Sequence, residues 1–243
     1  MAFPQTITGK FGWEKLTTTA QKHKLGTRMQ VADREFVYAS TGEAITAGKL
    51  VMGKAGTAAH QVDLAVSASS AGATTVTLSG SLSIAKDLYK DGWLIFNDTE
   101  EEGHMYRVKG NTLVSSATGC VVTIDEEDGL VAAITTSQQV GLYEHPNKAV
   151  EAHDANDVDH APIGWTCVDI ASGSYGWICV KGVTVALVDG TPAAGVPLIA
   201  SNGVDGAVEV YDEDGTVNLS PVGYMGPIAG VAGEYGLIKA NIE

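Results

Sequence analysis

The sequence is poor in positive charge and in charge of any kind. Only 15 of its 243 residues are lysine or arginine, against 29 aspartate or glutamate, and the net charge is −14. Nucleic-acid binding requires clustered positive charge, so nucleic acid is not expected as a partner of the body of the chain. Charged residues make up 18% of the sequence, which is too few for an architecture of long, solvated helices.

Cysteines and long apolar runs are also scarce. The three cysteines, Cys120, Cys167 and Cys179, give neither an even disulfide framework nor a CxxC pair. Cys167 and Cys179 stand in apolar runs and are expected to be small core residues. No apolar run reaches the roughly 18 residues of a membrane-spanning helix, so no membrane is expected as a partner. The opening MAFPQTITGK has no apolar core, so no secretory signal is expected.

Small and apolar residues dominate what remains. Glycine occurs 29 times, and 44% of the residues are apolar, which is enough for one large core or two smaller ones. Many glycines between short β-branched runs are typical of an all-β protein with many turns. The fold class expected is a β-barrel or β-sandwich.

One stretch, Trp177–Ala200, organises the expected fold. It reads WICVKGVTVALVDGTPAAGVPLIA, and its first half predicts one or two buried strands. Lys181-Gly182 is the only polar break in that half and predicts a hairpin or a bulge. An earlier stretch, Phe36–Met52, has the same order of strand, glycine turn and "AGxxL" step, with a gap of one residue, since the step reads AGKL there and AGVPL in the later stretch. We interpret the two as copies of one corner of a single β-fold, separated by an insertion.

The chain is therefore divided into three parts. Residues 1–35 are expected to form an extended N-terminal arm with a net charge of +3, from six basic and three acidic side chains, which leaves −17 on the other 208 residues. Residues 36–62 and 147–243 form a discontinuous β-barrel or sandwich domain. Residues 63–146 form an inserted β-domain, with strands expected at 73–78, 93–96, 105–108, 120–124 and 139–143 and at most two helical turns at 84–90.

A polar segment and three acidic turns were the candidates for chemistry. His153–His160 holds two imidazoles and three carboxylates, but its spacing matches no zinc site and no twelve-residue calcium loop. A solvated crossover is the simpler interpretation, and a metal-dependent hydrolase is the minor alternative. The acidic runs 100–102, 125–128 and 212–214 are expected at water-exposed hairpin tips, where nothing separates the pKa values of paired carboxylates.

Nucleophile and phosphate-binding motifs are absent from the sequence. No GxSxG is present, and Gly53-Lys54-Ala55-Gly56 has the wrong order for a phosphate-binding loop. Trp93, Trp165 and Trp177 lie in apolar runs and are expected in the core. We therefore predict no catalytic, metal-binding or cofactor-binding residues. A carbohydrate-binding β-module that uses Tyr175, Tyr211 and Tyr224 is the alternative binding function.

Several passages together resemble structural proteins of tailed-phage virions, of the capsid cement or decoration type. They are the opening FPQTITG, the inserted passage ATTVTLSGSLSIAKDLYKDGWLIFNDTEEEGHMYRVKG, the two AGxxL corners, and the tail GTVNLSPVGYMGPIAGVAGEYGLIKANIE. The resemblance covers nearly the whole chain, but its motifs are structural and bring no catalytic residue. A tail-tube, head-fibre or connector protein shares this composition.

The resemblance implies a non-enzymatic protein that is made in the cytoplasm of a host bacterium. It would lie on the outer surface of the phage head, bind the major capsid protein and form a homotrimer. Many symmetric copies would add avidity to weak single contacts. The basic arm would be the natural contact segment, and its candidate partner-binding residues are Lys10, Trp13, Lys15, Lys22, Lys24, Arg28 and Arg34.

Overall fold

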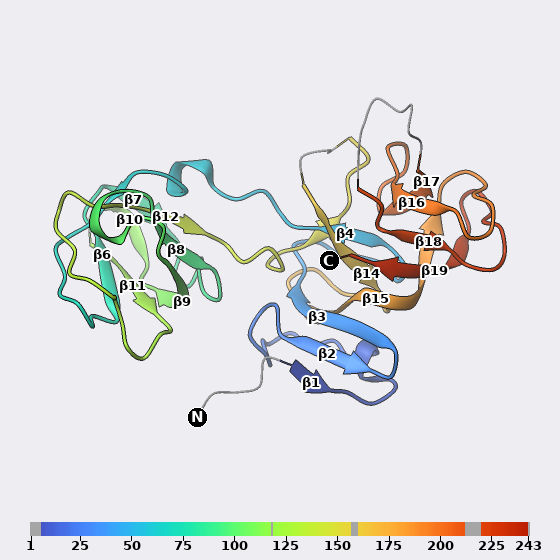
Figure 1. Ribbon diagram of the computed structural model, residues 1–243, viewed down its shortest axis with the longest axis horizontal. Coiled ribbons are helices and arrows are strands. Elements are labelled where there is room, and N and C mark those ends of the chain that lie inside the picture. Colours follow the sequence, from blue (N-terminus) through green and yellow to red (C-terminus); the bar gives the residue numbers. More distant parts are fainter. Residues whose placement is uncertain (1–5, 118, 157–159, 212–219, 243) are drawn as a thin grey trace. The chain divides into compact units, whose positions relative to one another are not determined.

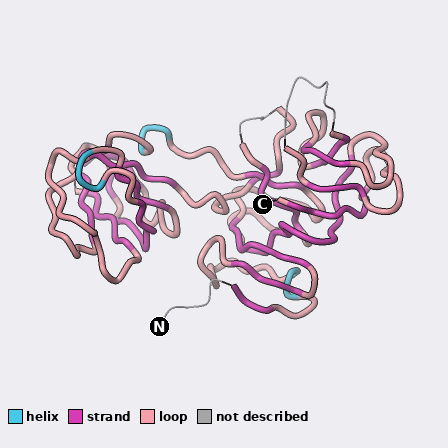
Figure 2. The backbone as a smooth tube through the Cα atoms, in the orientation of Figure 1, coloured by secondary structure: helices cyan, strands magenta, loops and turns pink. Residues whose placement is uncertain are grey.

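The structure is a computed structural model that describes residues 6–117, 119–156, 160–211 and 220–242. The chain forms two compact units: a split unit, Met1–Lys54 with Asn147–Glu243, and an inserted unit, Ala55–Pro146. Figure 1 shows the two units. Strands hold 43% of the residues and helices 4%, so the predicted all-β class is confirmed. The described helices are three short 3-10 turns, cyan in Figure 2, and none is long and apolar enough to cross a membrane.

The boundary between the units differs from the expected one. Residues 55–62 belong to the inserted unit. The Nδ1 atom of His60 lies 2.6 Å from the hydroxyl of Tyr89, and the hydroxyl of Tyr143 donates to the carbonyl of Gln61 at 2.8 Å. These contacts attach residues 55–62 to the inserted unit, although the sequence predicted that they belong to the discontinuous domain.

The split unit contains twelve of the described elements. They are β1 (Thr6–Thr8), η1 (Trp13–Lys15), β2 (Arg28–Val31), β3 (Arg34–Ser40), β4 (Leu50–Met52), β13 (Glu151–Ala152), β14 (Pro162–Thr166), β15 (Tyr175–Val188), β16 (Pro197–Ala200), β17 (Ala207–Val210), β18 (Gly223–Met225) and β19 (Tyr235–Asn241).

β15 is the central strand of the split unit and pairs with β3, β14, β17 and β19. Its first half is buried on both faces, as the continuous apolar run predicts. The pairing with β3 shifts in register between Cys179 and Lys181. Gly182 follows with φ 95°, a conformation that favours glycine. The polar break is therefore a bulge, and β15 continues through it as one strand.

Beyond the bulge, β15 is part of a closed barrel. The strand order β15-β17-β16-β18-β19 returns to β15 and makes a barrel of five strands. The interior is filled mainly by small and branched side chains, among them Ala186, Val188, Ala200, Val208 and Ala240. Leu198, Met225 and Ile238 are larger side chains of the same cluster. Small side chains at the other positions leave room for them, since the interior of a narrow barrel must be filled without clashes. The abundance of alanine and valine thus has a structural reason.

Residues 6–35, expected as an extended arm, are packed into the sheet. β1 runs parallel to β2, and β2 pairs antiparallel with β3, which extends the sheet from β15 to the N-terminus. β2 alternates between exposed and buried positions, so its apolar side chains face the sheet and its polar ones face solvent. The segment buries Leu25, Met29 and Val31. β2 is short and half of its residues are polar, so the composition of the segment gave no sign of a strand.

Five strands of the split unit open with the same turn. A glycine with φ between 71° and 77° precedes the first strand residue by two positions at Gly26, Gly48, Gly173, Gly195 and Gly233. Glycine adopts this left-handed conformation without the steric cost that a Cβ atom brings. Gly48 and Gly195 are the two Ala-Gly steps found in the sequence. The sequence echo therefore marks a turn that recurs in the split unit beyond those two copies.

The inserted unit contains the other ten described elements. They are η2 (Ala58–His60), β5 (Leu64–Ala65), β6 (Thr75–Leu78), β7 (Leu82–Ile84), β8 (Trp93–Phe96), η3 (Thr99–Glu101), β9 (Met105–Asn111), β10 (Val114–Ala117), β11 (Cys120–Ile124) and β12 (Gln139–Tyr143).

Six of these strands form a sheet that closes on itself. The order is β5-β12-β8-β9-β11-β6, and the predicted β8–β9 hairpin is confirmed. The backbone amide of Ser67 donates to the carbonyl of Thr77, and that of Ser79 donates to Ala65, both at 2.8 Å. These bonds join the two ends of the sheet around a single apolar core. β7 and β10 form a separate two-stranded sheet, and residues 86–90 form turns where two helical turns were allowed.

One acidic residue expected at an exposed turn is buried instead. Glu101, in η3, has no exposed surface. Its Oε2 accepts a hydrogen bond of 2.8 Å from the hydroxyl of Tyr106 and another from Nδ1 of His104, and its Oε1 accepts from the backbone amide of Ala132. A buried carboxylate is tolerated when donors surround it in this way. The acidic run at 212–214 lies outside the described residues.

Candidate functional site

An exposed apolar face lies on the wall of the five-stranded barrel. It consists of Val183 and Val185 on β15 with Tyr235 and Leu237 on β19, which are between 42% and 53% exposed. β15 and β19 pair directly, with Val185 opposite Leu237. On adjacent strands such side chains lie within contact distance of one another, so the four form one continuous surface.

The pattern on β15 reverses the usual one. Strands with one solvated face normally direct apolar side chains inward and polar ones outward. In the second half of β15, Val183 and Val185 point outward, whereas the hydroxyl-bearing Thr184 between them is only 4% exposed. Solvent contact alone does not explain two outward valines flanking an inward threonine. Contiguous exposed apolar surface of this kind is typical of an interaction site.

Two grooves flank the apolar face. The first has a volume of about 630 Å³ and is lined by both valines, Tyr235 and Leu237, together with residues of η1 and the turn at Gly48. The second has a volume of about 480 Å³ and lies beyond Val183 and Leu237, where Tyr224, Gly226 and Lys239 line it. Val183 and Leu237 line both grooves and therefore separate them, whereas Val185 and Tyr235 line only the first.

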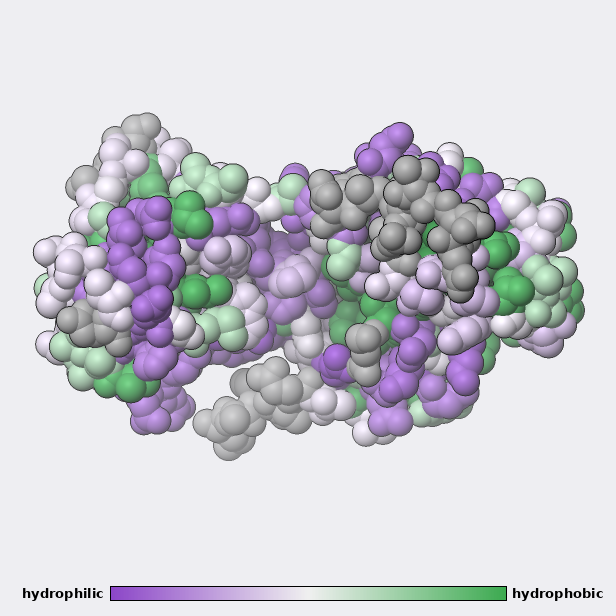
Figure 3. All heavy atoms as spheres, turned by 45° about the horizontal axis from the view of Figure 1, so that its top comes forward, coloured by the Kyte–Doolittle hydropathy of each residue, from purple (hydrophilic) through white to green (hydrophobic). Residues whose placement is uncertain are grey.

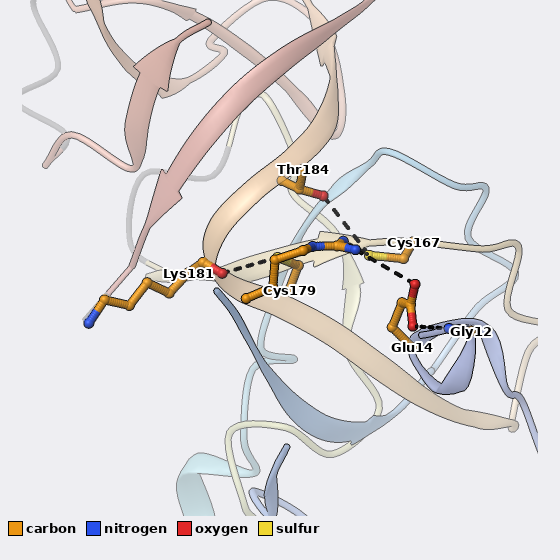
Figure 4. A network of polar contacts seen from close by, with 7 residues as sticks. Gly12, Glu14, Cys167, Cys179, Lys181 and Thr184 are labelled. Carbon is orange, nitrogen blue, oxygen red and sulfur yellow. Dashed lines mark hydrogen bonds and ion pairs between the residues drawn. The ribbon is translucent and has the colours of Figure 1, made fainter. Parts of the chain in front are cut away.

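A thiol cluster, which we define as Glu14, Arg34, Cys167, Cys179 and Thr184, lies at the first groove; all of its members except the buried Cys179 line the groove. Arg34 lies between an acid and a thiol, because its Nη1 is 3.6 Å from Oε1 of Glu14 and its Nη2 donates to Sγ of Cys167 at 3.3 Å. The hydroxyl of Thr184 lies 3.9 Å from the same sulfur. Figure 4 shows where the labelled members of the cluster lie: Glu14 is on η1, Cys179 and Thr184 are on β15, and Cys167 directly follows β14.

Local structure holds the cluster in place. The backbone amide of Gly12 donates to Oε2 of Glu14 at 2.7 Å, which fixes a carboxylate that is only 5% exposed. The Arg34 guanidinium lies over the ring of Phe36, 4.8 Å from its centroid. Cys179 is fully buried, and its thiol donates to the carbonyl of Lys181 at the bulge.

The two thiols of the cluster differ in acidity. Interaction with the neighbouring Cys179 thiol, helped by the charge of Arg34 and by the Thr184 hydroxyl and opposed by burial, lowers the pKa of Cys167. The same interaction, together with burial, raises the pKa of Cys179. The shift favours the thiolate of Cys167, the reactive form of cysteine. Cys120, in the inserted unit, is buried, and burial raises its pKa.

Six of the seven predicted partner-binding residues are exposed. These are Lys10, Trp13, Lys15, Lys22, Lys24 and Arg28. Arg34 differs, since its guanidinium faces Glu14 and Cys167. The apolar face was missed by sequence reasoning, because the run VTVALV was interpreted as a buried strand. Its alternation of valine and threonine was the available signal, but only the barrel establishes which side faces out.

The other candidates from the sequence do not form a site in the described part of the chain. His153 is buried, and Asp157 and Asp159 lie outside the described residues. Among the residues that are described, no three His, Cys, Asp or Glu side chains are grouped so that they could hold a metal ion. Of the tyrosines proposed for carbohydrate binding, Tyr175 stacks on Tyr38 at 5.9 Å, whereas Tyr224 is 48% exposed.

Comparisons of the chain with family models, with curated proteins and with solved structures found no match.

Proposed function

We propose that this protein is a non-enzymatic structural protein of a tailed-phage virion, a decoration protein that forms trimers on the outer surface of the head. The observation that carries the proposal is the apolar face, which gives the barrel a surface suited to packing against protein. The resemblance of the sequence to capsid cement proteins supplies the biological setting. The major capsid protein is then the second partner.

The energy available from the apolar face suits repeated, individually modest contacts. Its four side chains are each about half exposed. If a partner covers these four side chains completely, their burial contributes on the order of 4 kcal/mol to the free energy of association. Most stable complexes require more than this. Trimerisation and the many copies on a capsid repeat such a contact, and the overall affinity then rises through avidity.

A closed trimer requires two different patches that meet. The apolar face supplies one. The exposed Phe11 and Leu16, which flank η1 and are 80% and 57% exposed, supply apolar surface for the other. The exposed lysines of the same segment then lie where an acidic neighbour can pair with them, because the rest of the chain carries a strong negative charge.

Mutation of the apolar face tests the proposal. In the double variant Val185→Asp/Leu237→Asp, we expect the trimer to dissociate, so that size-exclusion chromatography with light-scattering detection finds the mass of a monomer. We also expect co-sedimentation with capsids to weaken at least about tenfold, the equivalent of roughly 1.4 kcal/mol. Leu113→Asp is the matched control, because Leu113 is a 67% exposed leucine of the inserted unit. A double variant that remains trimeric and sediments fully would refute the role of this face.

Charge reversal tests the basic N-terminal segment better than truncation does. Deletion of residues 1–30 would remove most of β2 and the buried Leu25 and Met29, so lost binding would also report lost folding. Reversal of Lys10, Lys15, Lys22 and Lys24 to glutamate changes exposed groups only. We expect weaker capsid binding with an unchanged melting temperature, and undiminished binding would exclude the segment as a contact.

Two observations distinguish the proposed protein from other virion components. Negative-stain images of a tail-tube protein show rings, whereas those of a decoration protein show closed trimers. A decoration protein also co-purifies with intact virions in a copy number that matches the capsid lattice. A low copy number would favour a fibre or connector, and specific glycan binding that is lost in Tyr224→Ala would favour the carbohydrate-binding alternative.

A further inference from the structure

The thiol cluster places one cysteine at the groove and a second directly behind it. Cys167 lines the first groove and is partly exposed, whereas Cys179 is fully buried. Trp165 on β14 pairs with Cys179 on β15, so Cys167 lies two residues further along the strand adjacent to Cys179. Cys167 also packs against the apolar cluster that contains Cys179. A reagent that enters the groove reaches Cys167 first, and Cys179 only through Cys167.

The groups around Cys167 favour its thiolate. Arg34 donates to the sulfur, and Glu14 holds Arg34 from the opposite side. Thr184 offers a hydroxyl to the sulfur from β15. Lys15 and Asp169 are the other charged residues that line the groove. A partly buried cation next to a sulfur in an open groove is the environment of a reactive cysteine, whereas an inert core cysteine has apolar neighbours.

We propose that Cys167 and Cys179 are a reactive dithiol that exchanges with small disulfides through the first groove. The Cys167 thiolate attacks one sulfur of a small disulfide, which forms a mixed disulfide and releases one small thiolate. Cys179 then loses its proton to solvent and attacks Sγ of Cys167, which forms the Cys167–Cys179 bond and releases the second small thiolate. The protein loses two electrons and two protons, and the small disulfide is reduced to two thiols.

This inference concerns chemistry within one chain. All four residues of the apolar face also line the first groove, so the exchange applies to the protein before a partner covers that face. The structure confirms both cysteines as residues of an apolar cluster, and the inference adds a reaction to that structural role. The positions of the two residues assign distinct roles, with Cys167 as the attacking thiol and Cys179 as the resolving thiol.

Oxidised glutathione at neutral pH is the probe that tests the proposal. After native incubation and alkylation of the remaining thiols, peptide mass spectrometry should find Cys167 joined to Cys179 and Cys120 alkylated. In Cys179→Ser, the reaction should stop at the mixed disulfide between glutathione and Cys167. Cys167→Ser should leave Cys179 free. Cys120→Ser is the control and should behave as the unaltered protein. A stable adduct on unaltered Cys167, an adduct on Cys179 in Cys167→Ser, or no reaction of the native protein would each overturn the proposal.

A second measurement tests the role of the Arg34 cation. Glu14→Gln/Arg34→Gln replaces the buried ion pair by two neutral side chains, which avoids leaving one charge without its partner. We expect the rate of Cys167 alkylation by iodoacetamide at pH 7 to fall several-fold, and the pH at half-maximal rate to rise. Circular dichroism confirms that the variant is folded. A folded variant with an unchanged pH profile would exclude Arg34 as the group that activates Cys167.

Discussion

The two units of this chain are both closed β-structures, but they use apolar residues differently. The inserted unit concentrates its apolar side chains in one core, and its exposed ones, Val62, Met105, Leu113 and Val131, come from separate segments. On the visible side, its hydrophobic residues are separate green spots among purple ones in Figure 3. In the split unit, four exposed apolar side chains lie on two paired strands. Scattered apolar residues need no explanation, whereas a contiguous set indicates a contact surface.

The buried polar groups differ in the same way. In the inserted unit they link neighbouring segments of one core, as Glu101 does with Tyr106 and as His60 does with Tyr89. In the split unit, Arg34 and Cys167 lie beside an open groove. A polar network enclosed in a core contributes to rigidity and fold specificity. The same groups at a groove remain accessible to a reagent.

The largest expected effect tests whether each unit has its own stability. Phe96 in the inserted unit and Phe36 in the split unit are both fully buried. Replacement of either by alanine should cost about 3–5 kcal/mol through lost burial and a cavity. In differential scanning calorimetry, Phe96→Ala should lower the transition of the inserted unit only, and Phe36→Ala that of the split unit only. If both transitions shift together in either variant, the units unfold as one and the comparison fails.

An intermediate effect concerns acid stability of the inserted unit. Burial, helped by the charge of Arg107 and opposed by Asp91, lowers the pKa of His145 to about 4, against 6.5 for an ordinary histidine. Between these pH values the unfolded chain binds a proton that the folded unit excludes, so stability falls as the pH falls. At about 1.36 kcal/mol per pKa unit, the loss is roughly 3 kcal/mol.

Urea unfolding at a series of pH values checks this expectation. The free energy of unfolding is plotted against pH for the unaltered protein and for His145→Gln. The two plots should be parallel above pH 7, and the unaltered protein should lose more stability from about pH 6.5 down to about pH 4. Parallel curves over the whole range would show that His145 protonates freely in the folded unit.

The smallest expected effect separates backbone strain from crowding in the strand-opening turns. A Cβ atom at Gly173 meets nothing within 4 Å, so Gly173→Ala should cost only the left-handed backbone, about 1–2 kcal/mol. At Gly48 the same atom would lie 2.7 Å from the ring of Tyr235, so Gly48→Ala should cost more. Both values come from the transition of the split unit in thermal unfolding. Equal costs would mean that Tyr235 moves aside freely.

The sequence predicts the elements whose pattern is local. Trp93–Phe96 and Gln139–Tyr143 are strands with the expected bounds, because an uninterrupted apolar run between turn residues has few other solutions. The bulge at Lys181-Gly182 was also predictable, since glycine marks a bulge in many strands. The all-β class follows from the same glycine and β-branched content.

Features that depend on distant partners were not predictable. β2 belongs to the sheet only because it pairs with β3, and Glu101 is buried only because Tyr106 and Ala132 donate to it. The outward direction of Val183 and Val185 requires the barrel. Cys167 and Cys179 carry no CxxC signal, because their proximity comes from two adjacent strands.

The central position of β15 has a consequence for the order in which the protein is made. β3 must wait for β15, its partner some 135 residues later, which at about 5–20 residues per second is a delay on the order of ten seconds. The whole inserted unit leaves the ribosome during that interval with all of its own strands. The middle of the chain is thus the first part able to complete its fold, whereas β3, although synthesised earlier, has only β2 as a partner until β15 is made.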